Sequence, residues 1–242
     1  MHSRIIKGTG KDMEMDIRMV IFDFDGTIAD TRKAIVTAKQ ETMKSEGLKV
    51  FDEEACASTI GLTAKAGFKM FYPDLSDERL GELVVKYRKR FDELKVTMPP
   101  VCFEGVKEVL AELRNRDIIC TIATSRNKKS LHEFLAGWGM DETFQFILCG
   151  EDTERLKPCP DPVLKTLERF SLKADKALVV GDMPVDIEMG KGAGAYTCGV
   201  TYGNSDRVSL HNSGADFIID SITDLLYLLD KCETGDGSSV HF

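Results

Sequence analysis

The chain alternates short apolar runs with longer stretches in which apolar residues recur every three or four positions. Six runs are rich in β-branched or aromatic residues and therefore predict strands, at residues 18–22, 118–123, 146–148, 177–180, 195–200 and 217–219. Strands that alternate with helices are typical of βαβ units. We therefore expect an α/β fold, a doubly wound (Rossmann-like) parallel sheet covered by helices on both faces.

One long segment, residues 34–98, interrupts this alternation. It has no strand pattern but four helix-like stretches, at residues 34–46, 52–58, 64–71 and 76–94. Asp30 and Ser76 are expected N-caps, and Met98-Pro99-Pro100 ends the segment rigidly. The predicted domains are an α/β core, a helical cap inserted after the first strand, and two flexible termini. Their boundaries are 17–32 and 100–231 for the core, 33–99 for the cap, and 1–16 and 232–242 for the termini.

Composition and charge narrow the possible partners. The 242 residues include 43% apolar ones and carry a net charge of −8, which disfavours nucleic acid and anionic lipid as partners. No apolar run is long enough to span a bilayer. The seven cysteines are widely spaced without a C-x-x-C pair, and the first residues lack an apolar signal segment. These features predict a cytoplasmic protein without a membrane partner.

The first candidate motif, Asp23-Phe24-Asp25-Gly26-Thr27, directly follows an apolar run. Alternate residues of an extended segment point the same way, so Asp23 and Asp25 are expected to face one pocket beyond the strand end. Two carboxylates this close repel each other unless a cation or a shared proton compensates. Gly26 lets the backbone turn and present N–H groups to an anion. An Asx turn that merely ends the strand is the weaker alternative for this pattern.

A second acidic motif, Gly181-Asp182-Met183-Pro184-Val185-Asp186, follows the run at 177–180. Asp186 lies four residues after Asp182, about one helical turn away, and Pro184 suits the first turn of that helix. Carboxylate oxygens from two separate strand ends favour Mg²⁺, which is completed by waters and substrate phosphate. A helix N-cap is the structural alternative for Asp182.

Two shorter motifs lie between these acidic ones. Thr124-Ser125-Arg126 follows the run at 118–123, where a hydroxyl beside the next helix N-terminus can donate to a phosphate oxygen. Lys157-Pro158 places a lysine on a loop that the proline restrains. Taken alone, a capping hydroxyl and a solvated surface lysine explain these residues equally well. Their order along the chain favours a role at the same site.

In this order the motifs DFDGT, ATS, LKP and GDMPVD resemble the phosphatase branch of the haloacid dehalogenase superfamily. The likeness extends from about residue 19 to residue 229, and the helical insert is similar to the small cap of phosphoglycolate-phosphatase-like and phosphomutase-like members. The resemblance implies that Asp23 is the nucleophile and a Mg²⁺ ligand. It implies that Asp25 is the general acid and base, with its backbone carbonyl on the metal. Lys157 would offset the charge on Asp23.

The resemblance also implies the binding residues. Asp182 would be the second side-chain ligand of Mg²⁺, and Asp186 would be a water-mediated or outer partner. Phosphoryl oxygens would be held by Thr124 and Lys157. The remaining residues expected to contact substrate are Gly26, Thr27 and Ser125 in the core and Thr63 and Lys65 in the cap loop 60–65.

Several details separate the possible activities. Asp25 is present, whereas true dehalogenases of the superfamily lack this residue. Ile60 and Ala64 stand where β-phosphoglucomutases carry a lysine and an arginine, and Lys65 is one position beyond the lysine of phosphonatases. The expected function is Mg²⁺-dependent hydrolysis of a small phosphate monoester, phosphoglycolate-like or a sugar phosphate, through a phosphoaspartate. An inorganic pyrophosphatase or phosphomutase on the same fold remains an alternative, and a non-catalytic binding protein is another.

Overall fold

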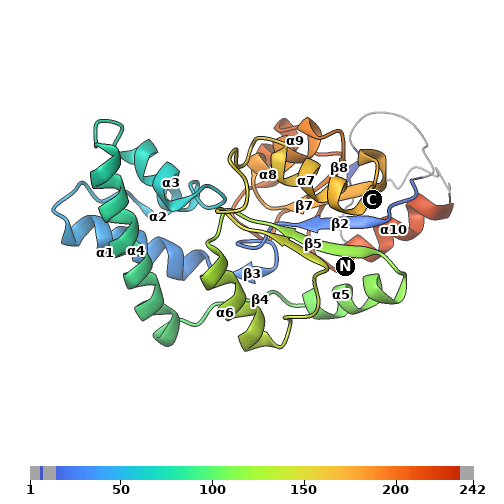
Figure 1. The fold of residues 1–242 in the computed structure, drawn as a ribbon, viewed down its shortest axis with the longest axis horizontal. Coiled ribbons are helices and arrows are strands. Elements are labelled where there is room, and N and C mark those ends of the chain that lie inside the picture. The colour runs from blue at the N-terminus through green and yellow to red at the C-terminus, as the bar shows by residue number, and fades with distance from the viewer. Residues whose placement is uncertain (1–5, 8–14, 235–242) are drawn as a thin grey trace.

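A parallel sheet runs through the larger part of the molecule, at the right of Figure 1. The computed structural model describes residues 6–7 and 15–234. Its main sheet has the order β1-β9-β8-β7-β2-β5-β6. The strands are β1 (Ile6–Lys7), β2 (Met19–Phe22), β5 (Ile119–Ala123), β6 (Phe146–Leu148), β7 (Ala177–Gly181), β8 (Tyr196–Val200) and β9 (Phe217–Ile219). All neighbours pair in parallel except β1, which is antiparallel to β9. The prediction of a parallel α/β sheet is confirmed.

Alternate side chains of the central strand β2 serve the two faces of the sheet. Met19 and Ile21 belong to the apolar cluster of α7 (Asp161–Phe170) and α8 (Pro184–Gly192). Val20 and Phe22 belong to the cluster that includes α5 (Val106–Asn115) and α10 (Asp224–Thr234). Figure 1 shows the same two layers of helices on either side of the sheet. The remaining bounds are α6 (Lys128–Trp138) and α9 (Arg207–Asn212).

Four helices form the cap at the left of Figure 1. They are α1 (Arg32–Ser45), α2 (Glu53–Ala57), α3 (Ala64–Phe71) and α4 (Asp77–Thr97). Ser76 caps α4 by accepting a hydrogen bond from the backbone N–H of Arg79, as its position in the sequence predicts. Helices α1 and α4 pack against each other, and α3 packs on α4.

A two-stranded ladder that the sequence did not predict joins the two chain segments leading into and out of the cap. Strand β3 (Ala29–Asp30) pairs antiparallel with β4 (Val101–Cys102). The expectation that Asp30 caps α1 is therefore wrong, because Asp30 lies in this ladder opposite Val101. The N-cap residue is Thr31, which makes no side-chain capping bond.

Some residues of the two segments that the sequence predicts to be flexible termini belong to the fold. Strand β1 pairs with β9, and Met15 is buried in the core. At the other end, α10 continues to Thr234, beyond the expected boundary at 231. The rest of the predicted flexible segments, at 1–5, 8–14 and 235–242, lies outside the described residues. Within the described residues, no helix combines the length and apolarity needed to cross a bilayer.

Candidate active site

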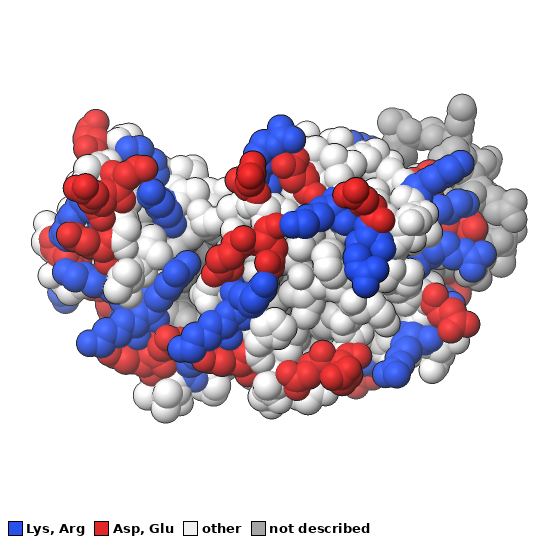
Figure 2. Space-filling view, viewed as in Figure 1, with Lys and Arg blue, Asp and Glu red and all other residues white. Residues whose placement is uncertain are grey.

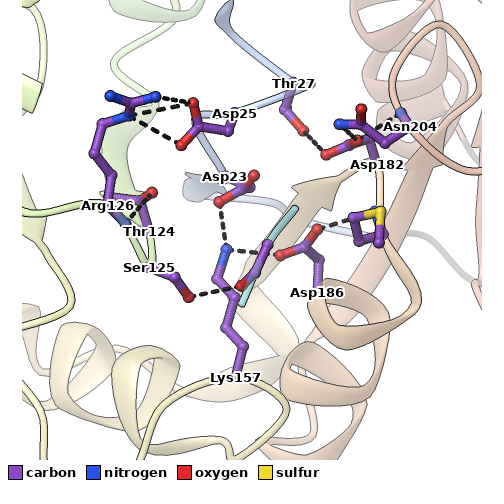
Figure 3. A network of polar contacts seen from close by, with 12 residues as sticks. Asp23, Asp25, Thr27, Thr124, Ser125, Arg126, Lys157, Asp182, Asp186 and Asn204 are labelled. Carbon is purple, nitrogen blue, oxygen red and sulfur yellow. Dashed lines mark hydrogen bonds and ion pairs between the residues drawn. The ribbon is translucent and has the colours of Figure 1, made fainter. Parts of the chain in front are cut away.

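The polar motifs of the sequence meet at the carboxyl edge of the sheet. Strand β2 lies between β5 and β7, with Phe22 level with Ile122 on one side and Val180 on the other. The residues that follow these strands are therefore neighbours, and Figure 3 shows Asp23 central among them. Lys157 reaches the same point from the loop between β6 and α7.

Three buried carboxylates, those of Asp23, Asp182 and Asp186, form one cluster. Each offers an oxygen that lies within 4.8 Å of those of the other two. Burial, with the charges of Asp186 and Asp182 beside it, raises the pKa of Asp23 well above its ordinary value. Burial and the charge of Asp186 raise the pKa of Asp182 to about 7. The cluster therefore calls for a cation to stabilise all three groups as carboxylates.

Lys157 supplies one positive charge to this cluster. Its ammonium donates to Oδ1 of Asp23 and, at 2.6 Å, to Oδ1 of Asp186. Burial alone would lower the pKa of Lys157, but the two carboxylates raise it above its ordinary value. The lysine is thus held as a cation, in the position against Asp23 that the family resemblance implies.

The other oxygens of the cluster distinguish Asp23 from its neighbours. Oδ1 of Asp182 accepts from Thr27 at 3.2 Å, and its Oδ2 accepts from the backbone and side chain of Asn204, both at 2.8 Å. Oδ2 of Asp186 accepts from the N–H of Met183 at 3.1 Å. In contrast, Oδ2 of Asp23 is buried and has no hydrogen-bond partner among the described residues. The clustered oxygens of these three carboxylates fit a hard, oxygen-seeking ion such as Mg²⁺.

Gly26 and Thr27 support Asp182 in this structure. Gly26 has φ +92°, and a Cβ there would lie 2.2 Å from Oδ2 of Asp182, so only glycine allows this close approach. The N–H of Gly26 donates to the carbonyl of Ala29 at 2.8 Å and is not free for an anion, which differs from the expectation. The hydroxyl of Thr27 is likewise directed to Asp182, not to the cavity.

Asp25 lies on the opposite side of Asp23 from Asp182 and Asp186 (Figure 3). Its carboxylate accepts a hydrogen bond from Thr31 at 2.7 Å and pairs with the guanidinium of Arg126. Its side chain is not part of the three-carboxylate cluster. The metal contact that the resemblance implies for Asp25 uses its backbone carbonyl, and this contact stays a prediction.

The Thr124-Ser125-Arg126 motif divides between the cavity and the cap. The buried hydroxyl of Thr124 accepts from the N–H of Arg126 at 3.1 Å and keeps its own proton available for a ligand. The hydroxyl of Ser125 donates to the carbonyl of Gly61 at 2.7 Å, which links the core to the cap loop. That proton is therefore not available to a phosphoryl oxygen in this arrangement.

A cavity of about 470 Å³ lies between core and cap. Its walls include Asp23, Asp25 and Thr124 from the core, and both Thr63 and Lys65 from the cap. The hydroxyl of Thr63 caps α3, and Lys65 pairs with Asp77 at 3.1 Å, yet both border the cavity. Their contact with a leaving group stays a prediction. Figure 2 shows the outline notched between cap and core, with basic and acidic side chains interspersed over the visible face.

Several residues of the site have no role in the sequence interpretation, and four of them carry polar or charged side chains that matter below. They are Thr31, Lys39, Arg126 and Asn204, which contact Asp25 or Asp182 or line the cavity. A signal was available for two of them. Arg126 directly follows Thr124-Ser125, and Asn204 lies in the polar stretch after the apolar run 195–200. Lys39 has only its position four residues after Ile35 on a helical pattern, which indicates a buried face and no chemistry.

Comparisons with known proteins agree with this geometry. The family model of haloacid dehalogenase-like hydrolases matches residues 20–200. A phosphoglycolate phosphatase of Photorhabdus laumondii is 30% identical over 229 residues, which cover 93% of this chain and 94% of that protein. The pyrophosphatase PpaX of Bacillus cereus is 29% identical over 221 residues, covering 90% and 98%. The crystal structure of a hydrolase from Pseudomonas syringae superposes with a TM-score of 0.80 at 25% identity, covering 88% of this chain and 98% of that one.

Proposed function

Because the chain belongs to the haloacid dehalogenase-like hydrolases, we propose that it is a Mg²⁺-dependent phosphatase that hydrolyses small phosphate monoesters through a phosphoaspartate. One observation carries the proposal. Asp23 borders the cavity with one oxygen held by Lys157, while its Oδ2 is buried without a partner among the described residues. A carboxylate oxygen that is desolvated and oriented in this way suits a nucleophile.

The residues present fit a magnesium ion. Carboxylate oxygens of Asp23 and Asp182 would hold it together with the backbone carbonyl of Asp25, and Asp186 lies beside them in the same cluster. When bound, Mg²⁺ supplies positive charge that reduces the repulsion between the phosphate and Asp23. Asn204 and Thr27 fix the orientation of Asp182, which a ligand of a small, geometrically strict ion requires.

The proposed reaction has two displacements at phosphorus. In the first, Oδ2 of Asp23 bonds to phosphorus, the ester P–O bond breaks, and the carboxyl of Asp25 gives its proton to the leaving oxygen. In the second, Asp25 accepts a proton from water, the water oxygen bonds to phosphorus, and the bond to Asp23 breaks to release phosphate. Lys157 and the hydroxyl of Thr124 would hold the phosphoryl oxygens during both steps.

Inorganic pyrophosphate is the second candidate substrate, because the relative named pyrophosphatase PpaX is nearly as similar as the phosphoglycolate phosphatase. A phosphomutase is a weaker alternative, since Ile60 and Ala64 occupy the positions of the charged residues expected in such a cap. The cavity volume of about 470 Å³ favours a small metabolite over a macromolecule. The absence of nucleic-acid and membrane partners and a cytoplasmic location stay predictions.

Phosphate release from a panel of phosphorylated metabolites, with Mg²⁺ and with EDTA, tests this proposal. Acid quenching during turnover, followed by mapping of the phosphorylated peptide, tests the intermediate. We expect Mg²⁺-dependent release and acyl phosphate on the peptide that contains Asp23. Failure of every ester, anhydride and generic aryl phosphate to release phosphate with Mg²⁺ would leave a binding protein as the better description.

A further inference from the structure

A buried lysine of the cap faces the same cavity as the nucleophile. Lys39 lies on α1, is 3% exposed, and lines the cavity that also contains Asp23 and Asp25. Ile35 precedes it by one helical turn and lines the cavity as well. Residues four apart share a helix face, so α1 directs this face toward the space above the catalytic carboxylates.

The ammonium of Lys39 is held in place by uncharged oxygens. It donates to the hydroxyl of Thr59 at 2.5 Å and to the carbonyl of Cys56 at 3.2 Å. The Thr59 hydroxyl in turn donates to the same carbonyl at 2.9 Å. Within the described part of the chain, these are the two acceptors that Lys39 has, although an ammonium carries three N–H donors. The charge is thus fixed in position, without a carboxylate partner in the described part of the chain.

The other cationic side chains at this site either pair with a carboxylate or are exposed to solvent. Arg126 pairs with Asp25, and Lys157 pairs with Asp23 and Asp186. The cap residue Lys65 pairs with Asp77, and Lys129 pairs with Glu133, at the cavity rim. Arg88 also borders the cavity, but its side chain is exposed to solvent. Lys39 therefore differs from the rest in being buried without a carboxylate partner among the described residues.

A buried cation without a counter-charge is unfavourable. Burial lowers the pKa of Lys39 to about 8, and the negative charge of Asp25 offsets only part of this effect. An anion that entered the cavity would replace the lost solvation and stabilise the ammonium. The phosphoryl group itself is already served by Lys157 and Thr124 in the core. A cation in the cap is therefore placed to contact the leaving group of the substrate.

We propose that Lys39 binds an anionic group on the leaving group, so that the preferred substrates carry a carboxylate or a second phosphate beyond the transferred phosphoryl group. This inference rests on the proposed phosphatase function and narrows its substrate class. Thr59 and Cys56 position the ammonium before substrate arrives, which reduces the ordering needed on binding. Hydrolysis of phosphoglycolate or pyrophosphate would then depend on Lys39, whereas hydrolysis of an ester with an uncharged leaving group would not.

Kinetics on matched substrates test this assignment. Two substrates form the charged arm of the test: phosphoglycolate, whose leaving group carries a carboxylate, and pyrophosphate, whose leaving group is a phosphate. Ethyl phosphate and p-nitrophenyl phosphate, whose leaving groups carry no further anionic group, form the uncharged arm. For Lys39→Met we expect kcat/KM to fall by at least about 30-fold on the charged arm and to stay within about threefold on the uncharged arm. A fall on one charged substrate alone identifies which anion the lysine serves.

Two further variants keep the test decisive. Lys44→Met removes an exposed lysine from the same helix and should leave all four substrates unchanged. Lys39→Gln removes the charge but keeps a donor for Thr59, and it replaces Lys39→Met if that protein does not fold. The wild-type enzyme provides an independent measure, because it should prefer phosphoglycolate over ethyl phosphate by at least about 30-fold.

The outcomes separate the two proposals. An equal loss on both arms, no loss on either arm, or a wild-type enzyme indifferent to leaving-group charge would overturn the role of Lys39 while leaving the phosphatase function intact. No phosphate release by the wild type from any of the four substrates with Mg²⁺ would overturn the proposed function, and the role of Lys39 with it.

Discussion

The guanidinium of Arg126 forms a two-point ion pair with the carboxylate of Asp25, with Nε 3.0 Å from Oδ2 and Nη2 2.5 Å from Oδ1. The pair fixes the orientation of the Asp25 carboxyl, to which the proposed reaction assigns proton transfer. The guanidinium carbon of Arg126 also lies 4.9 Å from the ring of Phe91 on the cap and 5.0 Å from that of Phe134 on the core. The residue that orients Asp25 therefore contacts both domains.

Arg126→Met should harm substrates with poor leaving groups most. Without its partner, Asp25 is no longer oriented toward the leaving oxygen, and proton donation matters little when the leaving group is already stable as an anion. We expect kcat/KM to fall about 100-fold for ethyl phosphate and by less than about fivefold for p-nitrophenyl phosphate. Arg114→Met, which changes an exposed arginine of α5, is the control. Equal losses on the two substrates would argue against a positioning role.

Asp23→Asn should abolish turnover without unfolding the protein. The amide is nearly isosteric, and Lys157 keeps Asp186 as an ion-pair partner, so the melting temperature should change by only a few degrees. We expect kcat to fall by at least about 10³-fold, measured as phosphate release at saturating Mg²⁺. Asp74→Asn, at an exposed cap position, should behave as wild type. Retention of near-wild-type kcat, with deamidation excluded by mass spectrometry, would rule Asp23 out as nucleophile.

Lys157→Met should destabilise the metal-free protein strongly. It leaves Asp23 and Asp186 buried without a cation, and breaking a buried ion pair in this way costs about 3–5 kcal/mol. Urea denaturation measures the loss, with Lys89→Met on the exposed side of α4 as the control. Adding Asp186→Asn to Lys157→Met should recover part of the free energy of unfolding. A double variant no more stable than Lys157→Met would place the cost elsewhere.

Mg²⁺ should stabilise the protein more at pH 8 than at pH 5. The pKa of Asp182 is about 7 in the folded protein and 3.8 ordinarily, so folding takes up a proton between these values. The contribution of Asp182 to the stability of the metal-free protein is then fully present below pH 3.8 and is lost as the pH rises through 7. A bound cation removes this loss, and differential scanning fluorimetry should show a Mg²⁺-induced rise in Tm that grows from pH 5 to pH 8.

The same metal should control turnover. EDTA is expected to silence phosphate release and Mg²⁺ to restore it, whereas Ca²⁺ should inhibit because its larger, looser coordination misplaces the nucleophile. Mg²⁺ added to Asp182→Asn should restore far less activity than it does in the wild type. Full turnover after exhaustive chelation would contradict the assignment of a catalytic metal.

The sequence predicted the elements of the site that lie directly on strand ends. Asp23, Thr124 and Asp182 follow apolar runs, and parallel strands bring such positions to one edge, so chain order alone placed them together. The contacts of Arg126 and Lys39 were not predictable in this way, because long side chains meet partners that only tertiary packing selects. The two-residue strands β3 and β4 were missed because so short a run carries no periodicity.

The glycine at the first motif shows a different reason for a missed role. Gly26 was expected to offer its N–H to an anion, a use that the motif itself suggests. In the structure that N–H donates to the carbonyl of Ala29 within the turn, and the absence of a side chain at Gly26 makes room for Asp182. The need for close approach becomes visible only when the second motif, 156 residues further along the chain, is placed against the first.

The pairing of β3 with β4 has a consequence for how this architecture diversifies. Asp30 and Val101 are direct ladder partners, so the two chain connections between core and cap run side by side as the strands of one hairpin. A two-residue turn of the Asn-Gly type has the geometry to close that hairpin in place of residues 31–100. The cap can therefore be lengthened, replaced or deleted, in evolution or by design, without changing the path of the chain through the core. A chain shortened in this way would expose its strand-end carboxylates to substrates that are too large for the present cavity.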